Sequence, residues 1–301
     1  MLGPPGAPTA IHDGSDVTIE RLDRSRYELE VEDTFLADRL DASLWIPHYL
    51  PQWASRERTL ARFDVGGGQL RLRIDADQAP WSPEWNGGIR VSNLQTGVFS
   101  GPVGSRIGQH HFRPDLVVRE AQEPRSLYTP RYGLIELTAR ATADPACLVA
   151  LWMIGFEDDP QRSGEICVME VFGRDVDAGL VRVGMGVHPF GDPSMNDDFE
   201  QVPVAVNALD PHTYSAEWTP DRVAFYVDDV LLKVVHESPA YPMQVMLDIY
   251  ELSREPAAGP AAGPVTGSGA YPRLFTIERF AGYRPVCGPG ARPPAWVRSG
   301  G

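Results

Sequence analysis

The chain has 301 residues, 43% of them hydrophobic and 23% charged, which is the composition of a globular protein long enough to bury a large core. Its formal net charge of −14 at pH 7 would repel phosphate backbones, so we expect no nucleic-acid partner. The apolar stretches fall short of the roughly 18 consecutive residues of a transmembrane helix, so we expect no membrane span.

Domain organisation follows from the distribution of proline, glycine and polar residues. We expect a loosely packed lead-in at residues 1–29, a single β-sandwich domain at residues 30–284 and a flexible tail at residues 285–301. The segment 256–269 is rich in Ala, Gly, Pro and Ser and is predicted to be a loop insert. We expect the protein to be a monomer.

The chain start and the cysteines bear on the compartment. Residues 1–6 contain neither a basic leader nor an apolar core, so they do not indicate a secretory signal. Cys147, Cys167 and Cys287 do not make an even disulfide set, and free thiols are typical of a reducing compartment. Two alternatives stay open: a cytoplasmic protein, or a secreted protein whose signal has been removed.

Strand patterns dominate the chain, and helical periodicity is nearly absent. Residues 66–68, three glycines, predict a turn, and the alternating residues 69–74 predict a strand. Residues 80–131 predict long loops with short strands, and long loops in compact domains are often functional. Residues 222–235 predict a hairpin with Asp228-Asp229 at its turn, and residues 274–283 predict the last strand. The fold class is therefore all-β.

Two glutamates stand in an apolar strand-like segment, GEICVMEVFG at residues 164–173. Glu165 and Glu170 are surrounded by Ile, Val, Met and Phe, where a charge is costly unless it is paired or used. Two carboxyl groups that face one cleft are what glycosidic bond cleavage requires. The segment therefore predicts a catalytic pair.

The five-residue spacing of this pair requires a β-bulge. In a regular strand, residues five apart point to opposite faces. One extra residue at Val168-Met169 would restore the phase and put Glu165, Cys167 and Glu170 on one face. Strand curvature would then bring the carboxyl groups toward the roughly 5–5.5 Å separation of a retaining glycosidase.

The segment resembles the active-site motif of glycoside hydrolase family 16, in which Glu, an apolar residue, Asp, an apolar residue, often a bulge residue, and Glu follow one another. The resemblance extends over roughly residues 30–284. Its further parts are DTF (33–35), LDASLW (40–45), YGLIELTAR (132–140), ALWM (150–153), HTYSAEWTP (212–220) and PMQVMLDIY (242–250).

The resemblance implies a two-sheet jelly-roll β-sandwich of the concanavalin A type with a concave substrate cleft. It implies a retaining endo-β-glycosidase that acts on a polysaccharide, with a β-1,3- or mixed-linkage β-glucan as the expected substrate. Glu165 falls on the family's nucleophile and Glu170 on its acid/base. The expected partner is a poly- or oligosaccharide, and no cofactor is expected to be required.

Cys167 stands where the family has aspartate. A neutral thiol removes a negative charge from between two carboxylates, which should make both easier to ionise and lower the pKa of the acid. We therefore expect weakened hydrolysis, an unusual pH optimum or loss of catalysis. The thiol itself is either a small buried filler, as free cysteines commonly are, or a reactive or metal-binding group.

Other residues are candidates for substrate contact. Trp152 is expected to stack under a sugar, because pyranose C–H faces pack on aromatic rings. His188, on the strand after the glutamates, is expected to contact the sugar or a carboxylate, as the resemblance implies. The remaining candidates are Trp85, in a loop, and Arg90, Asn93 and Gln244, for sugar hydroxyl groups.

We expect no catalytic metal. His110 and His111 are adjacent, and adjacent strand residues point apart, so they are not expected to share an ion. The resemblance makes a structural calcium ion possible, with Glu32 and Glu278 near the matching positions.

Two functional alternatives stay open beside hydrolysis. The substitution at Cys167 is compatible with a catalytically weak or inactive carbohydrate-binding protein on the same fold. A transglycosylase, in which a sugar hydroxyl replaces water, is the other alternative.

Overall fold

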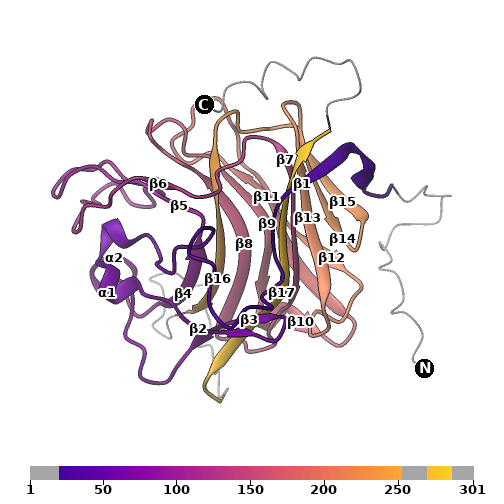
Figure 1. Ribbon diagram of the computed structural model, residues 1–301, viewed down its shortest axis with the longest axis horizontal. Helices are drawn as coiled ribbons and strands as arrows, with labels where there is room; N and C mark the ends of the chain where they lie inside the picture. Colours follow the sequence, from indigo (N-terminus) through magenta and orange to yellow (C-terminus); the bar gives the residue numbers. More distant parts are fainter. Residues whose placement is uncertain (1–19, 253–269, 287–301) are drawn as a thin grey trace, which may run out of the picture.

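Two antiparallel sheets face each other across a shared hydrophobic core in the computed structural model, which describes residues 20–252 and 270–286 (Figure 1). This architecture confirms the predicted all-β sandwich. The predicted insert 256–269, Cys287 and residues 1–19 and 287–301 of the predicted lead-in and tail lie outside the described residues.

One sheet, which we call the support sheet, has the strand order β15-β14-β13-β7-β17-β3-β2, and β1 pairs with β17 beside this path. Its strands are β1 (Tyr27–Asp33), β2 (Arg62–Gly66), β3 (Gln69–Ile74), β7 (Gly133–Arg140), β13 (His212–Trp218), β14 (Val223–Val227), β15 (Val230–Val235) and β17 (Arg273–Pro285).

The other sheet, which we call the site sheet, has the order β10-β11-β9-β8-β16-β4, and β12 pairs with β11. Its strands are β4 (Arg90–Gln95), β8 (Cys147–Gly155), β9 (Glu165–Phe172), β10 (Val176–Asp177), β11 (Leu180–His188), β12 (Asp198–Val204) and β16 (Met243–Glu251). Two short strands, β5 (Gly97–Val98) and β6 (Arg125–Ser126), pair to form a separate two-stranded ribbon.

The central strand β8 is apolar along its whole length because both of its faces are covered. Leu151 and Met153 point into the core between the sheets, whereas Trp152 and Ile154 belong to a second apolar cluster on the outer face of the site sheet. Full burial of each such large side chain contributes about 1.5–3 kcal/mol to folding. The apolar side chains of this outer cluster form the floor of a cleft on the outer face of the site sheet.

Loops that cover the outer face of the site sheet complete this cluster. They carry the short helices η2 (Pro51–Trp53), α1 (Arg56–Thr59) and α2 (Pro83–Asn86), which lie with the β5–β6 ribbon on the side away from the support sheet (Figure 1). The other short helices are η1 (Arg24–Arg26) and η3 (Gly173–Asp175). Among the described helices, none is long and apolar enough to cross a membrane.

Two predicted turns are confirmed. Asp228 and Asp229 join β14 to β15 with φ angles of 49° and 69°, the left-handed pair that a type I′ hairpin turn requires and that aspartate tolerates. Residues 66–68 join β2 to β3, and all three glycines have positive φ.

The N-terminal boundary of the domain lies earlier than residue 30. Leu22 is buried, Arg21 forms a bridge with Val230, and β1 begins at Tyr27 opposite Pro285. The Tyr27 hydroxyl group donates a 2.7 Å hydrogen bond to a carboxylate oxygen of Glu217. Residues 20–29 are therefore part of the sandwich, and the polar pattern of β1 is that of a half-exposed edge strand.

Candidate active site

The predicted bulge is present in β9. Toward β8, Met169 pairs with Leu151 and Cys167 pairs with Trp152, so Val168 is an extra residue on the β9 side. The ladder to β11 shows a register shift at the same place. Val168 and Met169 are fully buried in the core between the sheets. The bulge therefore turns both glutamates toward the outer face.

A cleft of about 500 Å³ lies on that face, and the predicted residues Glu165, Cys167, Glu170, Trp152 and His188 line it together. These residues come from the three neighbouring strands β8, β9 and β11. A sugar ring in this cleft would meet two carboxyl groups and an indole at once.

Two glycines of β11 leave room for the glutamate strand. A Cβ atom at Gly184 would lie 2.5 Å from a ring carbon of Phe199 and 3.1 Å from the Cβ of Glu170. Gly186 has φ +146°, and a Cβ there would lie 2.1 Å from the carbonyl oxygen of Asp198. The GMG sequence of β11 thus permits the close approach of β9 and β12 that the bulge requires.

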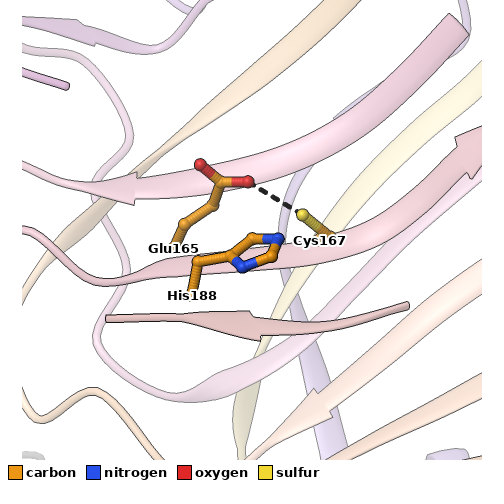
Figure 2. Close-up of side chains that lie close together, drawn as sticks. All are labelled: Glu165, Cys167 and His188. Carbon is orange, nitrogen blue, oxygen red and sulfur yellow. Dashed lines mark hydrogen bonds between the residues drawn. The ribbon is translucent and has the colours of Figure 1, made fainter. Parts of the chain in front are cut away.

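Glu165 is nearly enclosed, with 7% of its surface exposed. The Cys167 thiol donates a 2.8 Å hydrogen bond to its Oε1 (Figure 2). Its Oε2 lies 3.7 Å from Nδ1 of His110. Burial raises the pKa of Glu165 to about 7, although the hydrogen bond from Cys167 acts in the opposite direction.

Burial also raises the pKa of Glu170, while His188 acts to lower it. The pKa of the Cys167 thiol is well above its ordinary value because of burial and the two neighbouring glutamates, so the thiol is neutral. The sequence led us to expect that a thiol here lowers the pKa of the acid. Burial dominates the pKa of Glu170, and the separate effect of the thiol stays a prediction.

Side-chain hydrogen bonds from neighbouring strands fix the position of Trp152. Its indole Nε1 donates a hydrogen bond to Oδ2 of the buried Asp248, and the side chain of Asn93 donates to Oδ1 of the same carboxyl group at 2.8 Å. Burial raises the pKa of Asp248 to about 8. Asn93 was expected to contact a sugar, but its side chain is fully buried and donates a hydrogen bond to Asp248. This buried hydrogen bond to Asp248, on the strand between Asn93 and Trp152, corrects that assignment.

Gln244 requires the same correction. Its side chain is fully buried, donates to Oε1 of Gln95 at 3.2 Å and accepts a hydrogen bond from Gln109. Polar residues on an inner strand satisfy one another here, because unpaired buried amides are costly. Gln244 therefore supports the loop that carries Gln109 rather than meeting a sugar.

Arg90 and Trp85 also do not line the cleft around Glu165. Arg90 donates to Glu251 at 3.3 Å and to the hydroxyl group of Tyr271 at 3.1 Å. The half-buried Trp85 is flanked by the guanidinium groups of two arginines, 5.3 and 5.7 Å from its ring. A role for either residue in binding a longer substrate stays a prediction.

His188 lies beside Glu165, as the two are paired across β11 and β9. Its Nδ1 lies 2.7 Å from Oδ2 of Asp197, and its ring stacks on Phe199 with centroids 4.8 Å apart. The carboxylate and the stacked ring fix the orientation of the imidazole, which Figure 2 shows alongside Glu165 and Cys167.

Sequence reasoning missed several cleft residues: Tyr49, His110, Phe190, Asp197 and Tyr250. They lie in loops or at a strand end, where no periodicity singles them out. Only the aromatic content of the loop segments offered a signal, and that signal does not distinguish a cleft wall from a core anchor.

His110 is the most consequential of the missed residues. Its ring lies edge-on to Trp152 and Phe190, with centroids 5.0 and 4.8 Å away, and burial lowers its pKa to about 4. His111 instead packs beside Trp53. The two histidines therefore point apart, as expected.

The positions considered for calcium are occupied by ion pairs. Glu32 accepts from Arg279 at 2.7 Å, and Glu278 accepts from Arg140 at 2.9 Å. The structure therefore gives no support for calcium at these two carboxylates. Among the described residues, one group of three potential metal ligands lies close together: Glu165, Cys167 and His188, whose ligand atoms are all within 4.8 Å of one another.

Comparisons with known proteins agree with this geometry. A model described as glycosyl hydrolases family 16 matches residues 89–259, which is more than half of the chain. No curated protein matches the sequence.

Three solved structures illustrate the similarity. The GlcNAcα1-4Gal-releasing endo-β-galactosidase from Clostridium perfringens is 27% identical, with a TM-score of 0.72 over 91% of this chain and 66% of that chain. This chain thus spans 66% of the length of that enzyme. SCLam, a non-specific endo-β-1,3(4)-glucanase, is 18% identical, with a TM-score of 0.61 over 89% and 95%. The laminarinase catalytic domain from Thermotoga petrophila is 19% identical, with a TM-score of 0.58 over 86% and 98%.

Proposed function

Because this chain belongs to glycosyl hydrolases family 16, we propose that it is a retaining endo-β-glycosidase that cleaves a polysaccharide by double displacement. The observation that carries the proposal is the bulge at Val168-Met169, which puts Glu165 and Glu170 on one wall of one cleft. A binding protein would not need a bulge that turns a buried and a half-buried carboxyl group toward one cleft.

In this mechanism Glu165 attacks the anomeric carbon while Glu170 protonates the departing glycosidic oxygen. The sugar is then held as an ester of Glu165. Glu170, now a carboxylate, removes a proton from water, and that water attacks the same carbon and releases Glu165. The assignment rests on the order of the two glutamates in the family motif and on the more enclosed position of Glu165.

Aromatic side chains supply the sugar platform. Trp152 lines the floor of the cleft, and Tyr49, Tyr250 and Phe190 line it with Trp152. Aromatic rings pack on the apolar faces of pyranoses and bury area without requiring a charge on the substrate. This lining favours a polysaccharide, and it agrees with the acidic net charge of the chain in favouring a neutral one.

Two substrate classes follow from separate observations. The first is a β-1,3- or mixed-linkage β-glucan, toward which the family resemblance points. The second is a β-galactoside within a complex glycan, which the 27% identity to an endo-β-galactosidase favours.

The test is to incubate the chain, and its Glu165→Gln variant, with β-1,3-glucan, mixed-linkage β-glucan and β-galactosyl polysaccharides. Hydrolysis of one class to oligosaccharides, lost in Glu165→Gln, supports the proposal and selects the substrate. Calorimetric binding without any product would favour the carbohydrate-binding alternative. Products longer than the starting oligosaccharide would favour transglycosylation.

A further inference from the structure

We propose that Glu165, Cys167 and His188 form a binding site for a thiophilic divalent cation of the Zn²⁺ class. The three side chains come from two neighbouring strands, and their ligand atoms lie within 4.8 Å of one another. Donor atoms around a tetrahedral zinc ion lie about 3.5 Å apart, given bond lengths of about 2.0–2.3 Å. Small side-chain rotations therefore close the site, and Figure 2 shows the three groups converging.

The orientation of His188 is that of a metal ligand. Its Nδ1 lies 2.7 Å from a carboxylate oxygen of Asp197, so in the neutral ring this nitrogen carries the hydrogen. The lone pair is then on Nε2, the nitrogen available to Glu165 and Cys167. A carboxylate behind a histidine is the usual outer partner of zinc-binding imidazoles, and it fixes both the tautomer and the ring orientation.

A second observation concerns a residue outside this triad. Nδ1 of His110 is buried, has no hydrogen-bond partner among the described residues, and lies 3.7 Å from Oε2 of Glu165. A ligand ion at Glu165 would give this orphaned nitrogen a partner. His110 lies outside the group of three close ligand atoms, so it is positioned as a hydrogen-bonding neighbour of a water molecule in the fourth position.

Charge and ligand softness select the type of ion. One thiolate, one carboxylate and one neutral imidazole together balance a 2+ charge, so the ion and its three ligands carry no net charge in the largely buried site. Sulfur and imidazole ligands favour Zn²⁺ and discriminate against Mg²⁺ and Ca²⁺, which prefer oxygen. An aspartate at position 167, as in the family motif, would not provide this preference.

Binding exchanges a proton for the ion without any redox step. The S–H bond of Cys167 breaks, the proton leaves to solvent, and a sulfur–metal bond forms. A carboxylate held by the ion is no longer free to attack a sugar. Bound metal should therefore switch off hydrolysis reversibly, a consequence that rests on the proposed function, whereas the binding itself does not.

The experiment is a titration of the full chain with Co²⁺, followed by its thiolate-to-metal charge-transfer absorption, and with Zn²⁺, followed by calorimetry. The matched control is the double variant Cys147→Ser/Cys287→Ser, which leaves Cys167 as the sole thiol. We expect one ion per chain, a charge-transfer band in the parent and the control, and release of protons on binding.

Cys167→Ser should abolish the band and weaken Zn²⁺ affinity by about 100-fold or more, and Asp197→Asn should weaken it by about 10–100-fold with the band retained. Circular dichroism checks that each variant is folded. If Cys167→Ser does not fold, His188→Gln supplies the same test through lost affinity. A band that persists without Cys167, or a parent chain without one, would overturn the proposal.

Activity separates the two proposals. Zn²⁺ should stop hydrolysis by the parent and a chelator should restore it. A chain that binds Co²⁺ through Cys167 but hydrolyses no polysaccharide would leave the metal site standing and remove the proposed function. Hydrolysis without a cobalt–thiolate band would support the proposed function and remove the metal site.

Discussion

The Cys167 thiol donates a 2.8 Å hydrogen bond to Oε1 of Glu165. Both residues lie on β9, two positions apart, and line the same wall of the cleft. The thiol is neutral, whereas the family motif has a second carboxyl group at this position. The hydrogen bond therefore stabilises the carboxylate of Glu165 without adding charge beside it. The contact acts to lower the pKa of Glu165, which burial raises to about 7, and it puts the sulfur atom beside the carboxyl group in the proposed metal site.

The two glutamates should respond differently to substitution. Glu165→Gln replaces the attacking carboxylate with a neutral amide and should abolish turnover of every substrate. Glu170→Gln removes the proton donor and should reduce kcat on polysaccharide by about 10²–10⁴-fold. An aryl glycoside, whose leaving group needs no proton, should recover most of the first step in Glu170→Gln and none in Glu165→Gln. Equal losses on both substrates would contradict the assignment.

The acid limb of the pH profile should reflect Glu165. Its pKa is raised to about 7, so kcat/KM should fall as the pH decreases through about 7 in chelator-treated enzyme. Cys167→Ala removes the thiol hydrogen bond that lowers this pKa, and so should move the limb to higher pH. Cys167→Ser keeps a hydroxyl donor and is the control, in which the limb should stay close to its original position. Cys167→Asp should increase hydrolysis if the thiol weakens it.

Stability should fall as pH rises, because Asp248 is buried in its neutral form. Its pKa is about 8 in the folded chain and 3.8 as the reference value, so the stabilisation is complete below about pH 4 and is lost as pH rises through 8. Asp248→Asn cannot ionise and should flatten this slope. Urea unfolding from pH 5 to pH 9 measures the effect, and parallel slopes for the two proteins would contradict it.

Gly186→Ala should damage both stability and catalysis. The residue has φ +146°, and a Cβ there would lie 2.1 Å from the carbonyl oxygen of Asp198, so we expect a loss of about 1–3 kcal/mol and a displaced β9. Gly179→Ala is the matched control, since Gly179 also has positive φ but a Cβ there meets nothing within 4 Å. Thermal unfolding and kcat should show a clearly larger effect at Gly186. Similar losses at both positions would show that backbone strain alone accounts for the change.

Sequence reasoning was most successful where local physics is decisive. The bulge at Val168-Met169 was predictable because two apolar residues must both face the core if both glutamates are to face the cleft. The hairpin at Asp228-Asp229 was predictable because its turn needs residues that tolerate positive φ.

Contacts between residues far apart in the chain limited what could be predicted from the sequence. Asn93 and Gln244 are polar residues in apolar strands, which suggested substrate contact, but each donates a hydrogen bond to a buried partner far away in the chain. His110 enters the site only because a loop folds back over the site sheet. The first three residues of the edge strand β1, residues 27–29, were assigned to the lead-in because the exposed, charged residues of this strand lack an apolar face.

The stereochemistry of the first product tests the alignment of Glu165 and Glu170 most directly. Proton NMR of freshly released reducing ends, recorded before mutarotation, distinguishes the two outcomes for the substrate that the chain cleaves. Double displacement predicts that the β-anomer appears first. Initial release of the α-anomer would mean that a water molecule attacks the sugar directly, and that Glu165 is not the nucleophile.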